Sequence, residues 1–139
     1  MIFQHTIENV LNGTKAQTSR IVKPGEYAAG TEIGVISAVA THNKQALKWQ
    51  VGNTYAVQPG RGQKAVARIR ILQIRQMDVR EWDRYTAEPE KCGGLVGFWE
   101  LWCTMHDPYS LTYALTPFYL SMRPDELYQA WVLNFELVK

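Results

Sequence analysis

The chain has 139 residues, of which 46% are hydrophobic and 20% are charged, and its formal net charge is +2. This composition is typical of one soluble globular domain, which we place at residues 1–139. It excludes a membrane-spanning helix, because no apolar run approaches roughly 18 residues. The first residues also lack the basic and apolar regions of a signal peptide. The sequence therefore predicts a cytoplasmic protein with no membrane partner.

The cysteines and histidines show no pattern of a metal site. Cys92 and Cys103 form no C-x-x-C pair, and two cysteines cannot hold zinc without help from histidines. The histidines are His5, His42 and His106, and they show no ligand spacing. His106 is interpreted as a helix-end residue. We therefore predict two free thiols, no metal and no cofactor.

The charges are unevenly distributed along the chain. Residues 1–80 contain 11 Lys and Arg against 4 Asp and Glu, a balance of +7. Residues 81–139 contain 4 Lys and Arg against 9 Asp and Glu, a balance of −5. If the first part forms one side of the fold, that side is basic, which suits a polyanionic partner.

The first part of the chain predicts one helix and several strands. Apolar residues at helical spacing, followed by Gly13 in the position of a helix-ending glycine, indicate a helix over Phe3–Asn12. A strand follows over 18–22, and the Gly- and Pro-containing residues 23–34 are expected to be a loop. Further strands are expected over 35–41 and 54–57.

The clearest strand lies between residues 64 and 74, because its residues alternate. Its apolar face holds Ala65, Ala67, Ile69 and Ile71. The opposite face holds Arg68 and Arg70. The outer face of this strand is therefore predicted to be basic.

The second part predicts an amphipathic helix and a closing strand. Leu95, Phe98, Trp99, Trp102 and Met105 share one helical face. Residues 107–128 are broken by three prolines. The final strand, over 130–138, places alternate large apolar side chains on one face. Strands and helices without a βαβ rhythm predict an α+β fold with a curved sheet or small barrel.

Four segments, taken in order, resemble the ASCH domains of the PUA-like superfamily. The first is Gly13-x-Lys15-x-x-Thr18-x-Arg20, which is similar to the family's G-x-K-x-x-T-x-R signature. The others are the strand–turn–strand over 51–74, the acidic segment and F-x-x-x-W helix over 90–102, and the closing strand. The chain departs from the family at Ala16, at Gly93 and Gly94, and in an apparent insertion over 107–128.

The resemblance implies a small curved β-barrel flanked by two or three helices, with a cleft floored by the Lys/Thr/Arg stretch. The superfamily is associated with RNA and modified nucleobases. One subgroup removes the acetyl group of acetylated cytidine with a lysine, a threonine and a glutamate. Matched here, these are Lys15, Thr18 and a glutamate for which Glu90 is the first choice and Glu88 the second.

Physical chemistry gives each of these residues a role. A partly desolvated Lys15 has a lowered pKa and can act as base or electrostatic activator. Thr18 is a nucleophile or an orienting donor, and Arg20 can bind a carbonyl, carboxylate or phosphate. Glu90 can accept a hydrogen bond from an exocyclic amine or move protons. The alternative is an ordinary polar turn followed by a solvated acid.

Further ligand contacts are expected outside this stretch. Tyr55 and Trp49 could stack on a base, although packing in the core or at its rim is the alternative. A basic hairpin could contact phosphates, with a solvated strand face as the alternative. We define the basic hairpin as Arg61, Lys64, Arg68 and Arg70.

The sequence thus favours binding of RNA or a modified nucleoside in a basic cleft. A hydrolase is the first alternative, either an amidohydrolase acting on acetylated cytidine or a ribonuclease. A protein-interaction module, using the aromatic-rich second part of the chain, is the second alternative. An exposed apolar patch over residues 109–122 would favour this last function.

Overall fold

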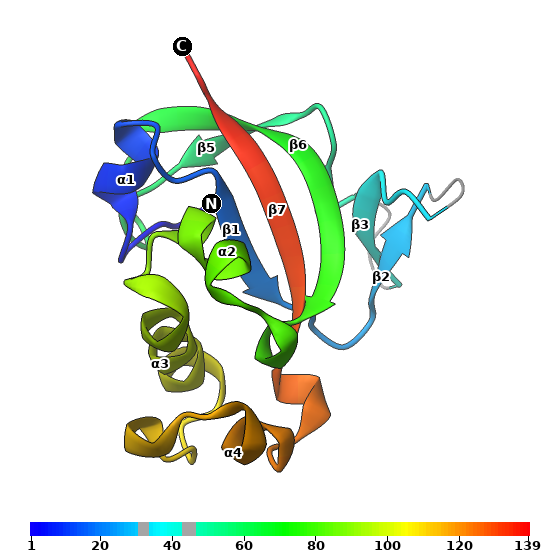
Figure 1. Ribbon diagram of the computed structural model, residues 1–139. Helices are drawn as coiled ribbons and strands as arrows, with labels where there is room; N and C mark the ends of the chain where they lie inside the picture. Colours follow the sequence, from blue (N-terminus) through cyan, green and yellow to red (C-terminus); the bar gives the residue numbers. More distant parts are fainter. Residues whose placement is uncertain (31–33, 43–46) are drawn as a thin grey trace.

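The computed structural model describes residues 1–30, 34–42 and 47–139, which contain two antiparallel sheets (Figure 1). The larger sheet has the strand order β1-β7-β6-β5, and the smaller has the order β2-β3-β4. The strands are β1 (Gln17–Ile21), β2 (Glu26–Ala29), β3 (Ala38–Thr41), β4 (Trp49–Gln50), β5 (Thr54–Val57), β6 (Ala67–Asp78) and β7 (Gln129–Val138).

Four α-helices accompany the sheets in this part of the chain. They are α1 (Ile7–Leu11), α2 (Arg84–Ala87), α3 (Gly94–His106) and α4 (Pro117–Ser121). Short 3-10 turns cover Val79–Glu81, Glu88–Glu90, Thr112–Ala114 and Asp125–Leu127. Across the described ranges, every helix is too short or too polar to span a bilayer.

The predicted small curved β-barrel is wrong. The described strands form two separate sheets, and no ladder between edge strands closes either of them. Beside β1 lies a non-strand segment, residues 84–92: Ala16 N–H donates to the Pro89 carbonyl at 3.3 Å, and Gln17 Nε2 donates to the Thr86 carbonyl at 3.0 Å. Strand alternation reports which face is buried and not which edge is paired, so the sequence could not reveal this arrangement.

β7 lies in the interior of the larger sheet and is buried on both faces. Ala130 and Val132 belong to the apolar cluster under α3. Trp131 and Leu133 belong to the cluster shared with the smaller sheet, where they meet Val39. Residues 130–133 are therefore all buried, so the predicted alternation describes only one of two apolar faces.

β6 follows the predicted alternation over its first half. Ile69 and Ile71 are fully buried, while Arg68 is exposed. A register shift between Ile71 and Gln73 then marks a β-bulge, which leaves Leu72 half exposed. The predicted basic outer face is real at the start of this strand.

Two predicted segments differ from the structure. α1 is shorter than Phe3–Asn12, because Phe3 runs extended beside β5 and its N–H donates to the Gln58 carbonyl at 2.9 Å. Gly13 follows this helix with φ +79°, as its predicted role requires. Residues 26–29, expected to be a loop, form β2 by pairing with β3, and residues 31–33 lie outside the described residues.

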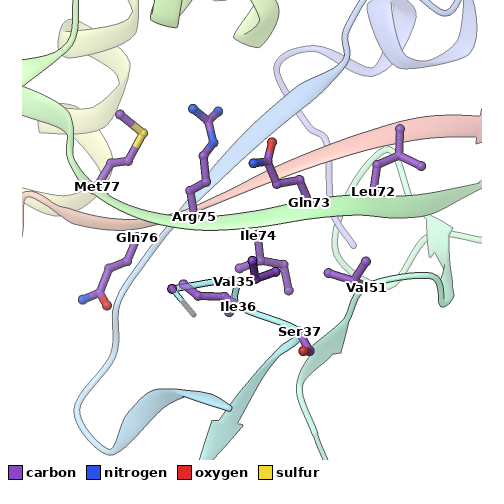
Figure 2. Close-up of a pocket in the computed structure, with 11 residues that line it drawn as sticks. Val35, Ile36, Ser37, Val51, Leu72, Gln73, Ile74, Arg75, Gln76 and Met77 are labelled. Carbon is purple, nitrogen blue, oxygen red and sulfur yellow. The ribbon is translucent and has the colours of Figure 1, made fainter. Parts of the chain in front are cut away.

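The two sheets meet at an isolated bridge between Ile36 and Ile74 and leave a hollow of about 690 Å³ beside it. Figure 2 shows Ile74 and Gln76 pointing toward the smaller sheet, and Arg75 pointing the opposite way. The Arg75 guanidinium donates to the side chains of Gln17 and Asn134. The side chains that point into the hollow are therefore apolar or neutral, whereas Arg75 points to the opposite face of the sheet.

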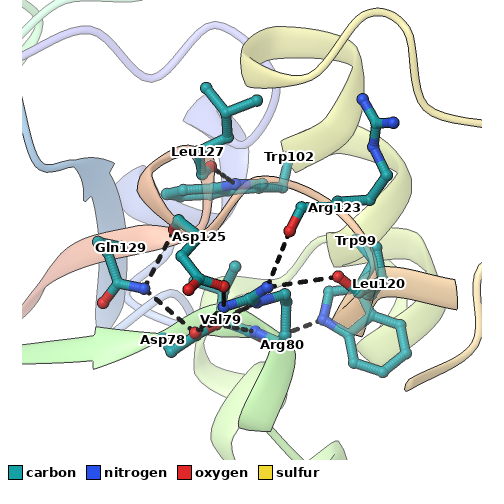
Figure 3. Close-up of polar contacts among 10 residues, drawn as sticks. All are labelled: Asp78, Val79, Arg80, Trp99, Trp102, Leu120, Arg123, Asp125, Leu127 and Gln129. Carbon is teal, nitrogen blue, oxygen red and sulfur yellow. Dashed lines mark hydrogen bonds and ion pairs between the residues drawn. The ribbon is translucent and has the colours of Figure 1, made fainter. Parts of the chain in front are cut away.

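Polar contacts hold residues 107–128 against α3 and the end of β6 (Figure 3). The Arg80 guanidinium pairs with Asp78 at 2.5 Å and Asp125 at 2.7 Å, and it also donates to the carbonyls of Leu120 and Arg123. The indole N–H groups of α3 bind this framework too. Trp99 donates to the Val79 carbonyl and Trp102 to the Leu127 carbonyl, each at 2.8 Å.

Gly97 fixes the distance between α3 and the 84–92 segment. A Cβ at this position would lie 2.3 Å from the Cys92 carbonyl oxygen. We therefore expect Gly97→Ala to destabilise the protein by about 1–3 kcal/mol, as overpacking does. Val96 is half exposed on the same helix, so Val96→Ala should change stability by less than about 0.5 kcal/mol. Urea unfolding of both variants tests this, and equal stabilities would contradict it.

Candidate functional site

A cavity of about 270 Å³ lies between the N-terminal residues, β1, the end of the 84–92 segment and α3. We call it the β1 cavity. Its apolar wall includes Phe3, Phe98, Trp102 and Met105. Its polar lining includes Lys15, Thr18, Ser19, Arg20, Glu90 and His106. The predicted lysine, threonine, arginine and first-choice glutamate therefore all line one cavity.

The turn after α1 aims Lys15 into this cavity. Gly13 has a positive φ, and the Lys15 N–H donates to the Asn9 carbonyl at 2.9 Å. The Asn12 side chain accepts from both the N–H and the hydroxyl of Thr14. This turn, rather than an extended strand, is what lets Lys15 share the cavity with Thr18, which is 4% exposed.

Lys15 is 5% exposed, and its Nζ donates to the main-chain carbonyl of Glu90 at 2.5 Å. No ion pair between the Lys15 ammonium and the Glu90 carboxylate is found. The two residues thus meet through a backbone oxygen. Burial lowers the pKa of Lys15, and the nearby Glu90 charge opposes that shift in part.

Glu90 ends a 3-10 turn and turns its carboxyl inward, where it is 2% exposed. Its Oε2 has no hydrogen-bond partner, and neither does the buried Ser19 hydroxyl. Burial raises the pKa of Glu90, while Lys15 acts in the opposite direction. Glu88, the second choice, is exposed and pairs with Lys91 outside the cavity.

Arg20 belongs to the same lining and lies on β1, two residues after Thr18. Its Nη2 donates to the Ile2 carbonyl at 2.8 Å, and its guanidinium lies 5.2 Å from the centre of the Phe3 ring. Burial lowers the pKa of Arg20, and the Glu90 charge opposes this. Arg20 therefore contacts both the N-terminal wall and the cavity.

Six polar lining residues were not among the predicted site residues: Gln4, His5, Thr6, Ser19, Cys92 and His106. His106 is the last residue of α3, as expected, but it also lines the cavity and packs against Trp102 with ring centroids 4.4 Å apart. Burial and the charges of Arg20 and Lys23 lower the pKa of His106 to about 4. In the sequence, only its position one helical turn after Trp102 of the F-x-x-x-W helix pointed to a place at the site.

The other predicted contacts lie elsewhere. The Tyr55 hydroxyl accepts from the Gln50 N–H at 2.7 Å, and Trp49 is a core residue. In the basic hairpin, Arg68 bonds to Thr54 and Arg70 pairs with Glu136. Arg61 and Lys64 are exposed. None of these side chains lines the β1 cavity.

The described residues contain no group of three or more His, Cys, Asp or Glu side chains placed to hold a metal ion. The polar lining of the β1 cavity instead combines two cations, one carboxyl, three hydroxyls, two imidazoles, an amide and a thiol. Perturbed titratable groups that converge on one partly apolar cavity are typical of ligand-binding or catalytic sites. The chemistry that fits is binding of a small polar molecule and proton transfer to it.

Glu90 provides a test of how the cavity affects stability. Because its pKa is raised from 4.5, stability is greatest with Glu90 protonated and is lost as the pH rises through the raised pKa. We expect Glu90→Gln to stabilise the protein by about 1 kcal/mol above that pKa. The gain should vanish at acidic pH. Thermal unfolding of parent and variant across the pH range measures this gain in stability. Glu88→Gln, at an exposed site, is the control. A Glu90→Gln variant that is less stable than the parent at alkaline pH would contradict the prediction.

No protein-family model matches the chain, and a comparison with curated proteins finds no significant match. One solved structure is similar: the crystal structure of protein EF3133 from Enterococcus faecalis V583, described with the family model DUF984. It has a TM-score of 0.56 and 15% sequence identity, and the match covers 94% of this chain and 68% of that one. At this identity the likeness shows a shared fold and nothing more.

Proposed function

We propose that this chain is an ASCH-type domain that binds a modified nucleoside, free or as an unpaired base of RNA, in the β1 cavity. The observation that carries the proposal is the convergence of Lys15, Thr18 and Glu90, which come from two distant parts of the sequence. A volume of about 270 Å³ is near the lower end of small-molecule pockets and suits one nucleoside. A cytoplasmic location is part of the proposal, supported by the two free cysteines.

The lining matches the chemistry of a nucleobase. Phe98 and Trp102 supply an apolar aromatic wall. The free Oε2 of Glu90 can accept a hydrogen bond from an exocyclic N–H. Lys15 can donate to a ring or acyl carbonyl beside it. A base with a donor group therefore gives the buried Oε2 of Glu90 the partner that it lacks within the protein.

In the RNA form of the proposal, one base enters the cavity and the backbone stays outside. The basic hairpin would contact phosphates there, through the exposed Arg61, Lys64 and Arg68. Because the basic hairpin does not line the β1 cavity, we expect the cavity to recognise the nucleoside and not the RNA backbone. The ribonuclease alternative gains no support from the described residues, which offer no cluster for a catalytic metal ion.

An amidohydrolase is the second candidate, favoured by the opposed pKa shifts of Lys15 and Glu90. With its lowered pKa, neutral Lys15 can take the proton of the Thr18 hydroxyl as that oxygen adds to the acetyl carbonyl. Protonated Glu90 can give its proton to the departing amino nitrogen. Water then releases acetate from Thr18, so that acetylated cytidine and water yield cytidine and acetate.

Lys15→Met tests both functions. We expect the parent protein to bind acetylated cytidine and Lys15→Met to bind it about tenfold less tightly, because a buried donor is lost. Turnover to cytidine should fall by at least about 100-fold with the base removed. Calorimetry and chromatography measure the two effects, with exposed Lys139→Met as the matched control. Absence of binding by the parent would overturn the proposal, and turnover that survives Lys15→Met would overturn the mechanism.

A protein-interaction role is the remaining candidate, because several apolar side chains within residues 109–122 are exposed. We call this surface the aromatic patch. Its most exposed members are Tyr109 (88%), Tyr113 (85%), Phe118 (76%) and Met122 (62%). Exposed apolar side chains gathered in one segment are typical of docking surfaces.

Self-association is one use of the aromatic patch that can be tested on the protein alone. If the patch pairs with itself, sedimentation should show a dimer that forms with rising concentration. The double substitution Tyr109→Ser and Phe118→Ser should abolish that dimer while leaving the unfolding temperature unchanged, because both side chains are exposed. A monomer at every accessible concentration would rule out this use of the patch.

A further inference from the structure

Arg20 is partly buried at the β1 cavity and has no carboxylate partner among the described residues. Its only described polar contact is one hydrogen bond, from Nη2 to the Ile2 carbonyl, although a guanidinium carries five N–H donors. No ion pair of Arg20 with a carboxylate is found among the described residues. A partly buried guanidinium that lines a cavity and makes one protein hydrogen bond keeps N–H donors available for a ligand.

The rest of the lining does not neutralise Arg20. Lys15 contacts a carbonyl oxygen, and Glu90 is the one carboxyl group in the described lining. These two groups balance each other in charge, whether both are ionised or both are neutral. His106 stays neutral near pH 7, and Arg20 and Lys23 contribute to its lowered pKa. The Arg20 charge is therefore left without compensation in the lining.

We infer that the ligand of the β1 cavity carries an oxyanion, and that Arg20 binds it, with His106 as a further hydrogen-bond donor. For a nucleoside ligand, this selects the 5′-monophosphate over the neutral nucleoside. The planar fork of an arginine suits two oxygens of a phosphate or carboxylate. This ligand class rests on the nucleoside site proposed above.

The competing explanation is structural. Arg20 could serve only to fasten the N-terminal wall, through the Ile2 carbonyl and the Phe3 ring. Such an arginine would affect stability and would weaken every ligand alike. An oxyanion-binding arginine changes the affinity difference between a ligand with a phosphate and the same ligand without it, which is the quantity to measure.

The experiment compares three probes by calorimetry: acetylated cytidine, its 5′-monophosphate and inorganic phosphate. On the parent protein, the monophosphate should bind at least about tenfold more tightly than the nucleoside, as expected for a charge-assisted contact. Arg20→Gln should remove this difference, and Arg20→Lys should retain part of it. Arg84→Gln, an equal charge change at an exposed site outside the cavity, should leave the difference intact.

Each failure has its own signature. Equal affinity of the parent protein for nucleoside and monophosphate would overturn the oxyanion inference and leave the proposed function standing. Binding of neither would overturn the proposed function. Inorganic phosphate that binds as tightly as the monophosphate would overturn the nucleotide form. If Arg20→Gln does not fold, Arg20→Lys decides, because a full phosphate advantage with a lysine would contradict the need for the arginine fork.

Discussion

The docking of residues 84–92 beside β1 is the contact on which the rest of the site depends. Three polar contacts fix it: Ala16 N–H to the Pro89 carbonyl, Gln17 to the Thr86 carbonyl, and Lys15 to the Glu90 carbonyl. An irregular segment thus lies where a barrel would need another strand. The same docking brings a glutamate from the second part of the chain to a lysine from the first. The free edge of β1 can pair either with a further strand, which would close a barrel, or with residues 84–92, which complete the site.

This arrangement buries charge without direct pairing. Lys15 and Glu90 are both at most 5% exposed, yet they are joined through a backbone oxygen. Burial shifts the pKa values of both residues toward their neutral forms, so ionising either group inside the cavity costs free energy. The well-satisfied network on the far side of α3 contrasts with it. There Asp107, which is 1% exposed, accepts from both Arg123 and the Tyr128 hydroxyl.

Local patterns predicted local structure well. Helical spacing located α3, and Gly13 located the end of α1, because both depend on residues near one another in sequence. The ordered signature selected Lys15, Thr18 and Glu90, which do share a cavity. The predictions that were wrong concern features that depend on pairing between residues far apart in the sequence. Sheet closure, the strand over 26–29, and the separation of the basic hairpin from the cavity follow from which edges meet, and periodicity carries no information on that.

The N-terminal wall of the cavity is fastened to the sheet on one side and to Arg20 on the other. The Phe3 N–H donates to the Gln58 carbonyl, the Gln58 N–H to the Met1 carbonyl, and the Met1 ammonium to the Ala56 carbonyl, all beside β5. Phe3 is also a core residue, packed edge to face on Phe135. β1 and β5 are the two outer strands of the larger sheet, and the hydrogen bond from Arg20 to the Ile2 carbonyl joins β1 to the chain that lines β5. The same guanidinium that faces the cavity therefore also ties together opposite margins of the sheet.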